Sequence, residues 1–157
     1  MIVRPGAMIW IDVVVPHGVA PDDIRGAMVW IGERWRRAVA PFAELAPSAD
    51  LTGTVGVAPE LAVHSGGMVE TAWSDLICFA GIGPGEVLLN GRKLVGLSQR
   101  RTRRGLRIQG LVHCSALTAL LPGLLKGELP CADLAEPAVL PVLAADSVAA
   151  ALAAQIH

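Results

Sequence analysis

Apolar and β-branched residues run almost without interruption from Ala7 to Val15, where Pro16-His17-Gly18 ends the run. A run of this length and composition predicts a strand that is buried on both faces. Asp12 is its one charged member. The pattern then changes, because the apolar residues that follow recur at intervals instead of in one block.

This second pattern is a single apolar stripe at spacings of three and four, made of Ile24, Met28, Ile31, Trp35, Val39 and Phe42. The spacing predicts an amphipathic helix, and Asp22 is suitably placed to cap its N-terminus. Trp30 and Trp35 are expected in or near the core.

The strongest turn signal is Asn90-Gly91, because both residues tolerate the positive φ that a type I′ turn demands. It separates residues 86–89 from residues 92–95, and the two segments therefore predict a β-hairpin. Gly81 to Gly85, just before the hairpin, is a bend that no helix could cross.

Several shorter elements complete the pattern. Strands are expected at 54–57, 61–64, 75–80 and 106–112, and helices at 117–125 and at 146–155, the last capped by Asp146 or Ser147. Successive strands with one long helix early and small helices late predict an α+β fold, with helices packed on an antiparallel or mixed sheet. A chain of 157 residues without an internal repeat fits a single domain, 1–157.

Composition excludes several classes of protein. A hydrophobic share of 53% with 17% charged residues argues against disorder, and a net charge of −1 argues against overall attraction to nucleic acid. No apolar run reaches the ~18 residues of a spanning helix, and the first residues show no export signal, so we expect a cytoplasmic protein without a membrane partner. Three cysteines without paired spacing indicate reduced thiols and no metal site.

Positive charge is concentrated in one segment, since seven of the thirteen Lys and Arg residues lie between Arg92 and Arg107. Strand alternation predicts one side with Lys93, Val95, Leu97 and Gln99, and another with Leu94, Gly96, Ser98 and Arg100. A lysine, a glycine that permits close approach and a polar end suit an anion or a polarised carbonyl. The alternative is a solvated hairpin edge that Lys and Arg protect from aggregation.

The segment from Leu89 to Arg101, LNGRKLVGLSQRR, resembles the signature of lipoate-protein ligases and lipoyl or octanoyl transferases. That signature has a Gly, a basic residue, the active-site Lys, a Gly, and a small residue followed by Gln-Arg. The segments Cys78 to Val87 and Trp10 to Pro16 are also similar to this family, so the resemblance covers residues 7–125. It implies the α/β fold shared with biotin ligases and class II aminoacyl-tRNA synthetases, incomplete at the N-terminus.

In that family the motif lysine contacts the acyl-adenylate, so the resemblance implies this role for Lys93. ATP with Mg²⁺ would activate lipoate or octanoate, and a lysine of a lipoyl carrier domain or a glycine cleavage H-type protein would attack the acyl carbonyl. Lys93 would stabilise the developing oxyanion and the phosphate leaving group. The implied binding residues around the adenylate are Gly91, Gly96, Ser98, Gln99 and Arg100.

Cys78 indicates a second route, because octanoyltransferases of this family carry a nucleophilic cysteine in a Cys-Phe context like Cys78-Phe79. Such a thiolate would take the acyl group as a thioester without ATP. The alternative is a small buried hydrophobe inside a strand. Gly66 and Gly67 could cradle a phosphate or an acyl chain, although a Gly-Gly turn between strands is the commoner explanation. His113 is assigned no role.

The family also carries several dozen residues before the strand that Trp10 to Pro16 resembles, with an Arg-Arg, Ser or Thr, Gly-Gly-Gly motif, where this sequence has Val3-Arg4-Pro5-Gly6. A fragment, a homologue completed by a second chain and a chain without activity are the three explanations. If upstream strands are absent, the edge of the Ala7 to Val15 strand is expected to favour self-association.

Lipoyl or octanoyl transfer is the leading hypothesis, and biotin transfer is the runner-up within the same chemistry. A different class is a non-catalytic subunit that binds an acyl group or a nucleotide. Nucleic-acid binding ranks last, because no aromatic residues are interleaved among its candidate contacts, Arg100, Arg101, Arg103, Arg104 and Arg107.

Overall fold

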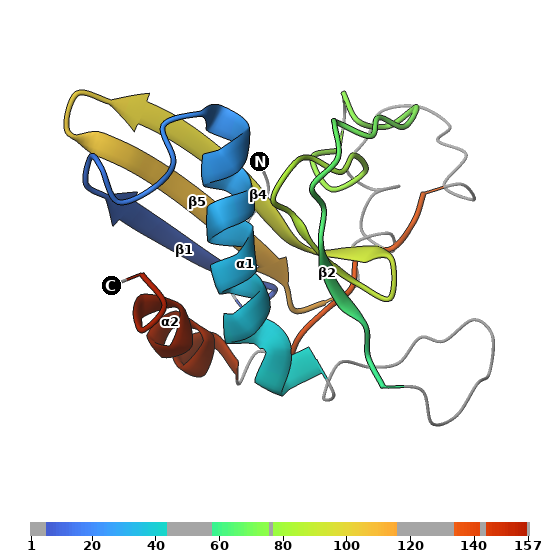
Figure 1. Cartoon of the computed structure of the whole chain (residues 1–157). Helices are drawn as coiled ribbons and strands as arrows, with labels where there is room; N and C mark the ends of the chain where they lie inside the picture. The colour runs from blue at the N-terminus through green and yellow to red at the C-terminus, as the bar shows by residue number, and fades with distance from the viewer. Residues whose placement is uncertain (1–5, 44–57, 76, 116–133, 142–143, 157) are drawn as a thin grey trace.

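The computed structural model describes residues 6–43, 58–75, 77–115, 134–141 and 144–156 (Figure 1). The elements in chain order are β1 (Met8–Val15), α1 (Ile24–Ala43), β2 (Leu61–Val63), β3 (Val87–Leu89), β4 (Arg92–Thr102), β5 (Gly105–His113) and α2 (Ala145–Ala153). The five strands form one antiparallel sheet in the order β1-β5-β4-β3-β2. The predicted α+β class with an antiparallel sheet is confirmed.

One core joins the sheet to the helices. α1 crosses one face of the sheet, and α2 packs against α1 near β1 (Figure 1). Ile31 and Trp35 of α1 are fully buried in the same cluster as Ile108 and Val112 of β5, and Leu152 of α2 closes it. Among the described residues, no helix is both long and apolar enough to cross a membrane.

The predicted apolar stripe of α1 faces this core, except at the first turn. Asp23, and not the predicted Asp22, caps the helix, because its carboxylate accepts a hydrogen bond from Gly26 N at 2.6 Å. Ile24 is 66% exposed, so the first member of the stripe lies outside the core. Trp30 is half-buried beneath the guanidinium of Arg34, in agreement with a place near the core.

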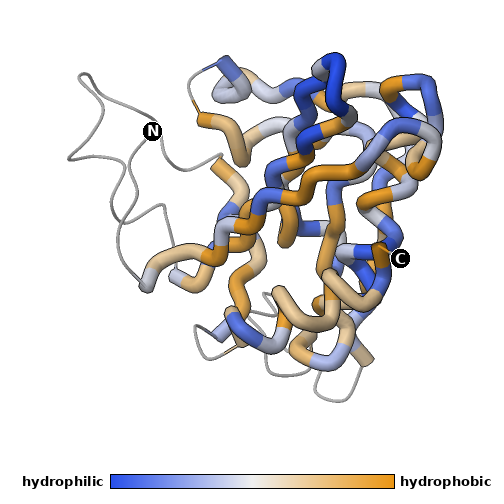
Figure 2. The backbone as a smooth tube through the Cα atoms, turned by 90° about the vertical axis from the view of Figure 1, so that its left-hand side faces the viewer, coloured by the Kyte–Doolittle hydropathy of each residue, from blue (hydrophilic) through white to orange (hydrophobic). Residues whose placement is uncertain are grey.

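The prediction that β1 is buried on both faces is wrong. Ile9, Val13 and Val15 are buried, whereas Trp10 is 39% and Val14 is 69% exposed. Polar and apolar residues alternate along much of the backbone (Figure 2). The exposure of β1 alternates because α1 covers only one face of the sheet. The residues of β1 between the buried positions point to the other face.

We call this other side the open face. The pairing register sorts its members into three rows across β1, β5 and β4: Trp10, Leu111 and Gly96; then Asp12, Gln109 and Ser98; then Val14, Arg107 and Arg100.

The hairpin of β3 and β4 is confirmed, with Asn90 at φ +50° and Gly91 at φ +74° in its turn. The strands expected at 61–64 and 106–112 are present as β2 and β5. The expected segments 54–57 and 117–125 lie outside the described residues.

Two expectations about local structure are wrong. Residues 75–80 do not form a strand: their described members are in turns, closed by hydrogen bonds such as Ile77 N to Trp73 O at 2.8 Å. α2 follows Ala144 without a side-chain cap from Asp146 or Ser147. Its burial against α1 through Val148 and Leu152 holds the helix in place instead.

Candidate functional site

Lys93, the second residue of β4, is a buried cation with 7% exposure. Its Nζ lies 2.7 Å from Oε1 of Glu86. It also donates hydrogen bonds to Gly81 O at 2.8 Å and to Cys78 O at 3.1 Å. These three acceptors occupy the three N–H donors of an ammonium group, so Lys93 is held inside the protein.

Glu86 links the bend before β3 to two residues of β4. The residue is 5% exposed, and its carboxylate accepts hydrogen bonds from Gly83 N at 2.8 Å and from Leu97 N at 3.3 Å, besides the ion pair with Lys93. The bend before β3 and the middle of β4 are therefore joined through one buried carboxylate. Removing either charge of such a pair would leave the other without compensation.

A β-bulge decides which way Lys93 points. β3 pairs Leu88 with Lys93 but Val87 with Val95, which leaves Leu94 as an extra residue in β4. A bulge interrupts the alternation of side chains along a strand.

The prediction that Lys93 and Gln99 share one side of β4 is consequently wrong. A Cβ built on Gly96 would lie 3.3 Å from Cε of Lys93, so Lys93 lies beside Gly96. Gln99 instead donates to Ile24 O at 3.2 Å and faces α1. Of the motif residues, the structure brings Lys93, Gly96, Ser98 and Arg100 to one side and separates Gln99 from them.

Phe79 supplies a structural reason for Gly96. A Cβ at Gly96 would lie 2.9 Å from Cε2 of Phe79, so only glycine leaves space for this ring. Nζ of Lys93 stands 4.8 Å from the ring centroid, within cation–π range. The aromatic ring thus packs over Gly96 and beside the buried cation.

His113 completes the buried group and was not expected there. Its ring packs edge to face on Phe79 with centroids 4.1 Å apart, and the residue is 4% exposed. Among the described residues neither ring nitrogen has a hydrogen-bond partner. Burial, together with the charge of Lys93, lowers the pKa of His113 to about 4, so the imidazole is neutral at pH 7.

The open face changes from apolar to basic with distance from Lys93. The row of Gly96 is apolar, the next row is polar, and the third holds Arg100 and Arg107. Successive rows stand about 7 Å apart, because each is two residues further along its strand. Arg100 is exposed. Arg107 instead donates two hydrogen bonds to the carboxylate of Asp12, from Nε at 3.1 Å and from Nη2 at 2.8 Å. These hydrogen bonds hold the pKa of Asp12 below its usual value.

Cys78 has an exposed side chain, so the alternative of a buried hydrophobe inside a strand is wrong. It lies in the turns between Trp73 and Gly81, and its carbonyl oxygen is one of the acceptors of Lys93. Cys114 is half-buried, and burial raises the pKa of its thiol. Cys131 lies outside the described residues.

Gly66 and Gly67 belong to the loop after β2. Nε2 of His64 lies 2.7 Å from Gly67 O, and a Cβ on Gly66 would lie 2.7 Å from the same ring. The loop is therefore closed on His64, as a turn between strands would be. Gly91 lies in the hairpin turn, where a Cβ would meet nothing within 4 Å, so its left-handed φ accounts for the glycine.

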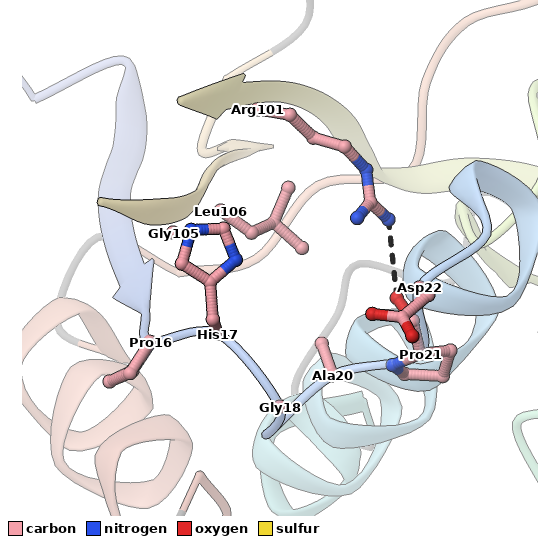
Figure 3. Close-up of a pocket in the computed structure, with 9 residues that line it drawn as sticks. All are labelled: Pro16, His17, Gly18, Ala20, Pro21, Asp22, Arg101, Gly105 and Leu106. Carbon is pink, nitrogen blue, oxygen red and sulfur yellow. Dashed lines mark hydrogen bonds between the residues drawn. The ribbon is translucent and has the colours of Figure 1, made fainter. Parts of the chain in front are cut away.

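A small cavity lies away from Lys93, at the end of β1 (Figure 3). It has a volume of about 40 Å³, which suits one or two water molecules. Two of the polar side chains in its wall are already bonded: Arg101 donates to Pro21 O at 3.2 Å, and His17 lies 2.9 Å from Arg103 O. The cavity therefore offers no free cation to a ligand.

Comparisons with protein-family models, with curated proteins and with solved structures gave no match to this chain. Within the described ranges, no group of three or more His, Cys, Asp or Glu side chains could hold a metal ion. The candidate site accordingly rests on the sequence motif and on the geometry around Lys93.

Proposed function

We propose that the open face binds an activated acyl group, and that the chain serves lipoyl or octanoyl transfer to a lysine of a carrier domain. The observation that carries this proposal is the alignment of Lys93, Gly96, Ser98 and Arg100 along one side of β4. Such a line runs from a buried cation through a small residue to an exposed cation. It suits a ligand that combines an apolar chain with a phosphate.

The apolar row offers a place for the acyl chain. Leu111 and Trp10 lie side by side on neighbouring strands, and the ring of Phe79 lies over Gly96 in the same row. Phe79, Leu111 and Trp10 would then line the acyl chain over about 10 Å, the span of three strands, which is comparable to an extended octanoyl chain. The phosphate and nucleotide would then lie along β4, where Ser98 offers a hydroxyl and Arg100 a guanidinium.

The chemistry proposed for this face is acyl transfer from a mixed anhydride. The carrier amine forms the new C–N bond, the C–O bond to phosphate breaks, adenylate leaves and the amine loses a proton. Lys93 would stabilise the negative charge on the acyl and phosphate oxygens. Because its three donors are occupied, a ligand must replace one acceptor, and the carbonyl oxygens of Cys78 and Gly81 are easier to replace than the charged Glu86.

ATP would supply the adenylate in this scheme. The hydroxyl of Ser98 and the guanidinium of Arg100 fit a phosphate group. Mg²⁺ has no carboxylate cluster among the described residues. We therefore assign it no protein ligand.

A binding experiment tests the proposal with variants that leave the buried pair intact. We expect a non-hydrolysable lipoyl-adenylate analogue to bind the folded chain in calorimetry, and Arg100→Gln to weaken binding about tenfold or more, because one charge-assisted contact is lost. Arg104→Gln is the matched control, since this exposed arginine lies in the hairpin turn beyond the open face. Equal affinities of the Arg100 and Arg104 variants, or no binding at all, would contradict the proposal. A biotinyl-adenylate analogue that binds more tightly would favour the runner-up.

A second candidate is octanoyl transfer through Cys78. This residue is exposed, and its carbonyl oxygen accepts a hydrogen bond from Lys93. The thiolate would attack the thioester of an octanoyl carrier, form a new thioester and release the carrier thiol. We expect peptide mass spectrometry after incubation with this donor to find octanoyl on Cys78, and Cys78→Ser to remove it. Cys114→Ser should leave the modification unchanged. An unmodified Cys78 would argue for the adenylate route.

The remaining alternatives predict different results. A non-catalytic subunit would bind the adenylate analogue without transferring an acyl group. Nucleic-acid binding would show a steep dependence on salt. The structure weakens this last candidate, because Arg101 and Arg107 already bond groups of the protein.

A further inference from the structure

β1 forms one edge of the sheet, and within the described ranges β5 is its one strand partner. Its eight residues contain no Pro and no Lys, which usually protect such an edge. The opposite edge is β2, which has three residues. A strand edge as long and as apolar as β1 is a template for pairing with another strand.

The hydrogen-bond pattern shows which groups of β1 face outward. Cys114 N donates to Ala7 O at 2.8 Å, so this opposite pair is of the hydrogen-bonded kind. Hydrogen-bonded and non-bonded pairs alternate in an antiparallel ladder. The backbone N–H and C=O groups that point away from β5 therefore belong to the even-numbered residues, Met8, Trp10, Asp12 and Val14.

We infer that this edge pairs with β1 of a second copy of the chain, in antiparallel orientation about a two-fold axis. Even-numbered residues must then face even-numbered residues, because they carry the outward backbone groups. Two registers give the longest overlap of the strand with itself. One centres on Asp12 and places two carboxylates opposite each other, which is destabilising. The other centres on Ile11.

Charge selects the register about Ile11. In this register Asp12 lies opposite Trp10 of the second copy, and Met8 lies opposite its Val14. Arg107, which holds Asp12 at 2.8 Å, is thereby brought close to the indole of the second copy, where a cation–π contact is favourable. Ile11 meets its own copy on the axis, with Ile9 opposite Val13.

The side chains that α2 exposes are mainly small. The helix lies near β1 in the layer of α1 (Figure 1). Its exposed residues are small, namely Ser147, Ala149, Ala150 and Ala153, together with Asp146. Two such helices can approach across the axis without large side chains between them. The pairing uses each β1 edge once, so it closes at two copies instead of forming fibres.

Sedimentation equilibrium of the full chain tests the dimer and its register. We expect a concentration-dependent dimer. Trp10→Glu should raise its dissociation constant about tenfold or more, because each new carboxylate would face Asp12 of the second copy. Trp10→Lys is the matched variant: it removes the same indole but faces Asp12 with an opposite charge, so its effect should be clearly smaller. Equal effects of the two variants would overturn the register.

A backbone variant tests the edge itself. Val14→Pro removes an outward N–H that β5 does not use, so the fold should survive while the dimer weakens. A dimer unchanged in Val14→Pro with a native circular dichroism spectrum would overturn the inference, as would a wild-type monomer at every concentration. If Val14→Pro does not fold, the two Trp10 variants still decide. Binding of the adenylate analogue, scored separately by Arg100→Gln, distinguishes this result from failure of the proposed function.

Discussion

Replacing Lys93 with methionine is expected to lower the free energy of unfolding by about 3–5 kcal/mol, the range found when one partner of a buried ion pair is removed. The variant keeps an unbranched chain of similar length beside Phe79 but leaves the carboxylate of Glu86 buried with two backbone N–H donors. Urea unfolding followed by circular dichroism measures the loss.

The exposed pair of Asp12 and Arg107 is the matched control for this prediction. Its side chains are 37% and 51% exposed, so solvent screens the pair and Asp12→Asn should destabilise the protein far less than Lys93→Met. Adding Glu86→Gln to Lys93→Met should restore part of the stability, because a neutral amide oxygen still accepts from Gly83 and Leu97. A double variant as unstable as the sum of the single ones would show that the two charges are not coupled.

The expected loss of stability complicates the interpretation of Lys93 variants in binding experiments. A Lys93 variant that fails to bind an adenylate could have lost either the contact or the local structure around Glu86. Arg100 is exposed on the open face and lies away from the buried pair, so its substitution separates the two causes. Substitution of Arg100 is therefore a clearer test of adenylate binding than substitution of Lys93.

The hairpin and the long helix were predictable because their signals are local. Asn90-Gly91 specifies its turn through two positive φ values, and the stripe of α1 specifies which side meets the sheet. The Ala-rich C-terminal helix was also predicted, within a residue or two at each end. None of these requires knowledge of distant contacts.

The orientation of Lys93 was not predictable in the same way. Strict alternation along β4 assumes that every residue has one partner, and the unpaired Leu94 breaks this assumption without a sequence signal. The strand predicted at residues 75–80 is absent for a related reason. Their apolar composition is typical of a strand, but the carbonyl of Cys78 bonds Lys93 instead of a neighbouring strand.

The candidate site also contains two residues that sequence reasoning missed. Glu86 was assigned to the hairpin strand, although a glutamate directly after a glycine-rich bend and before three apolar residues is a signal for a buried carboxylate. His113 gives a weaker signal as the last residue of a strand. Its contact with Phe79 depends on how the turns fold over the sheet, which the sequence pattern does not reveal.

Gly85→Ala is expected to lower the free energy of unfolding by about 3 kcal/mol, which combines overpacking with a left-handed backbone conformation. Gly85 has φ +86°, and a Cβ there would overlap Met28 O of α1. On the facing helix, a Cβ at Gly32 would overlap Gly85 O. The helix and the bend therefore meet backbone to backbone. Gly67→Ala is the control, since a Cβ at Gly67 meets nothing within 4 Å.

The same contact positions the charge pair, because Gly85 directly precedes Glu86. If α1 and the bend are forced apart, the carboxylate moves and Lys93 loses its partner. We therefore expect Lys93 to react faster with an amine-acetylating reagent in Gly85→Ala than in the wild type or in Gly67→Ala, measured by peptide mass spectrometry under native conditions. Equal protection of Lys93 in all three proteins would mean that Glu86 is held by Gly83 and Leu97 alone, independently of its contact with the helix.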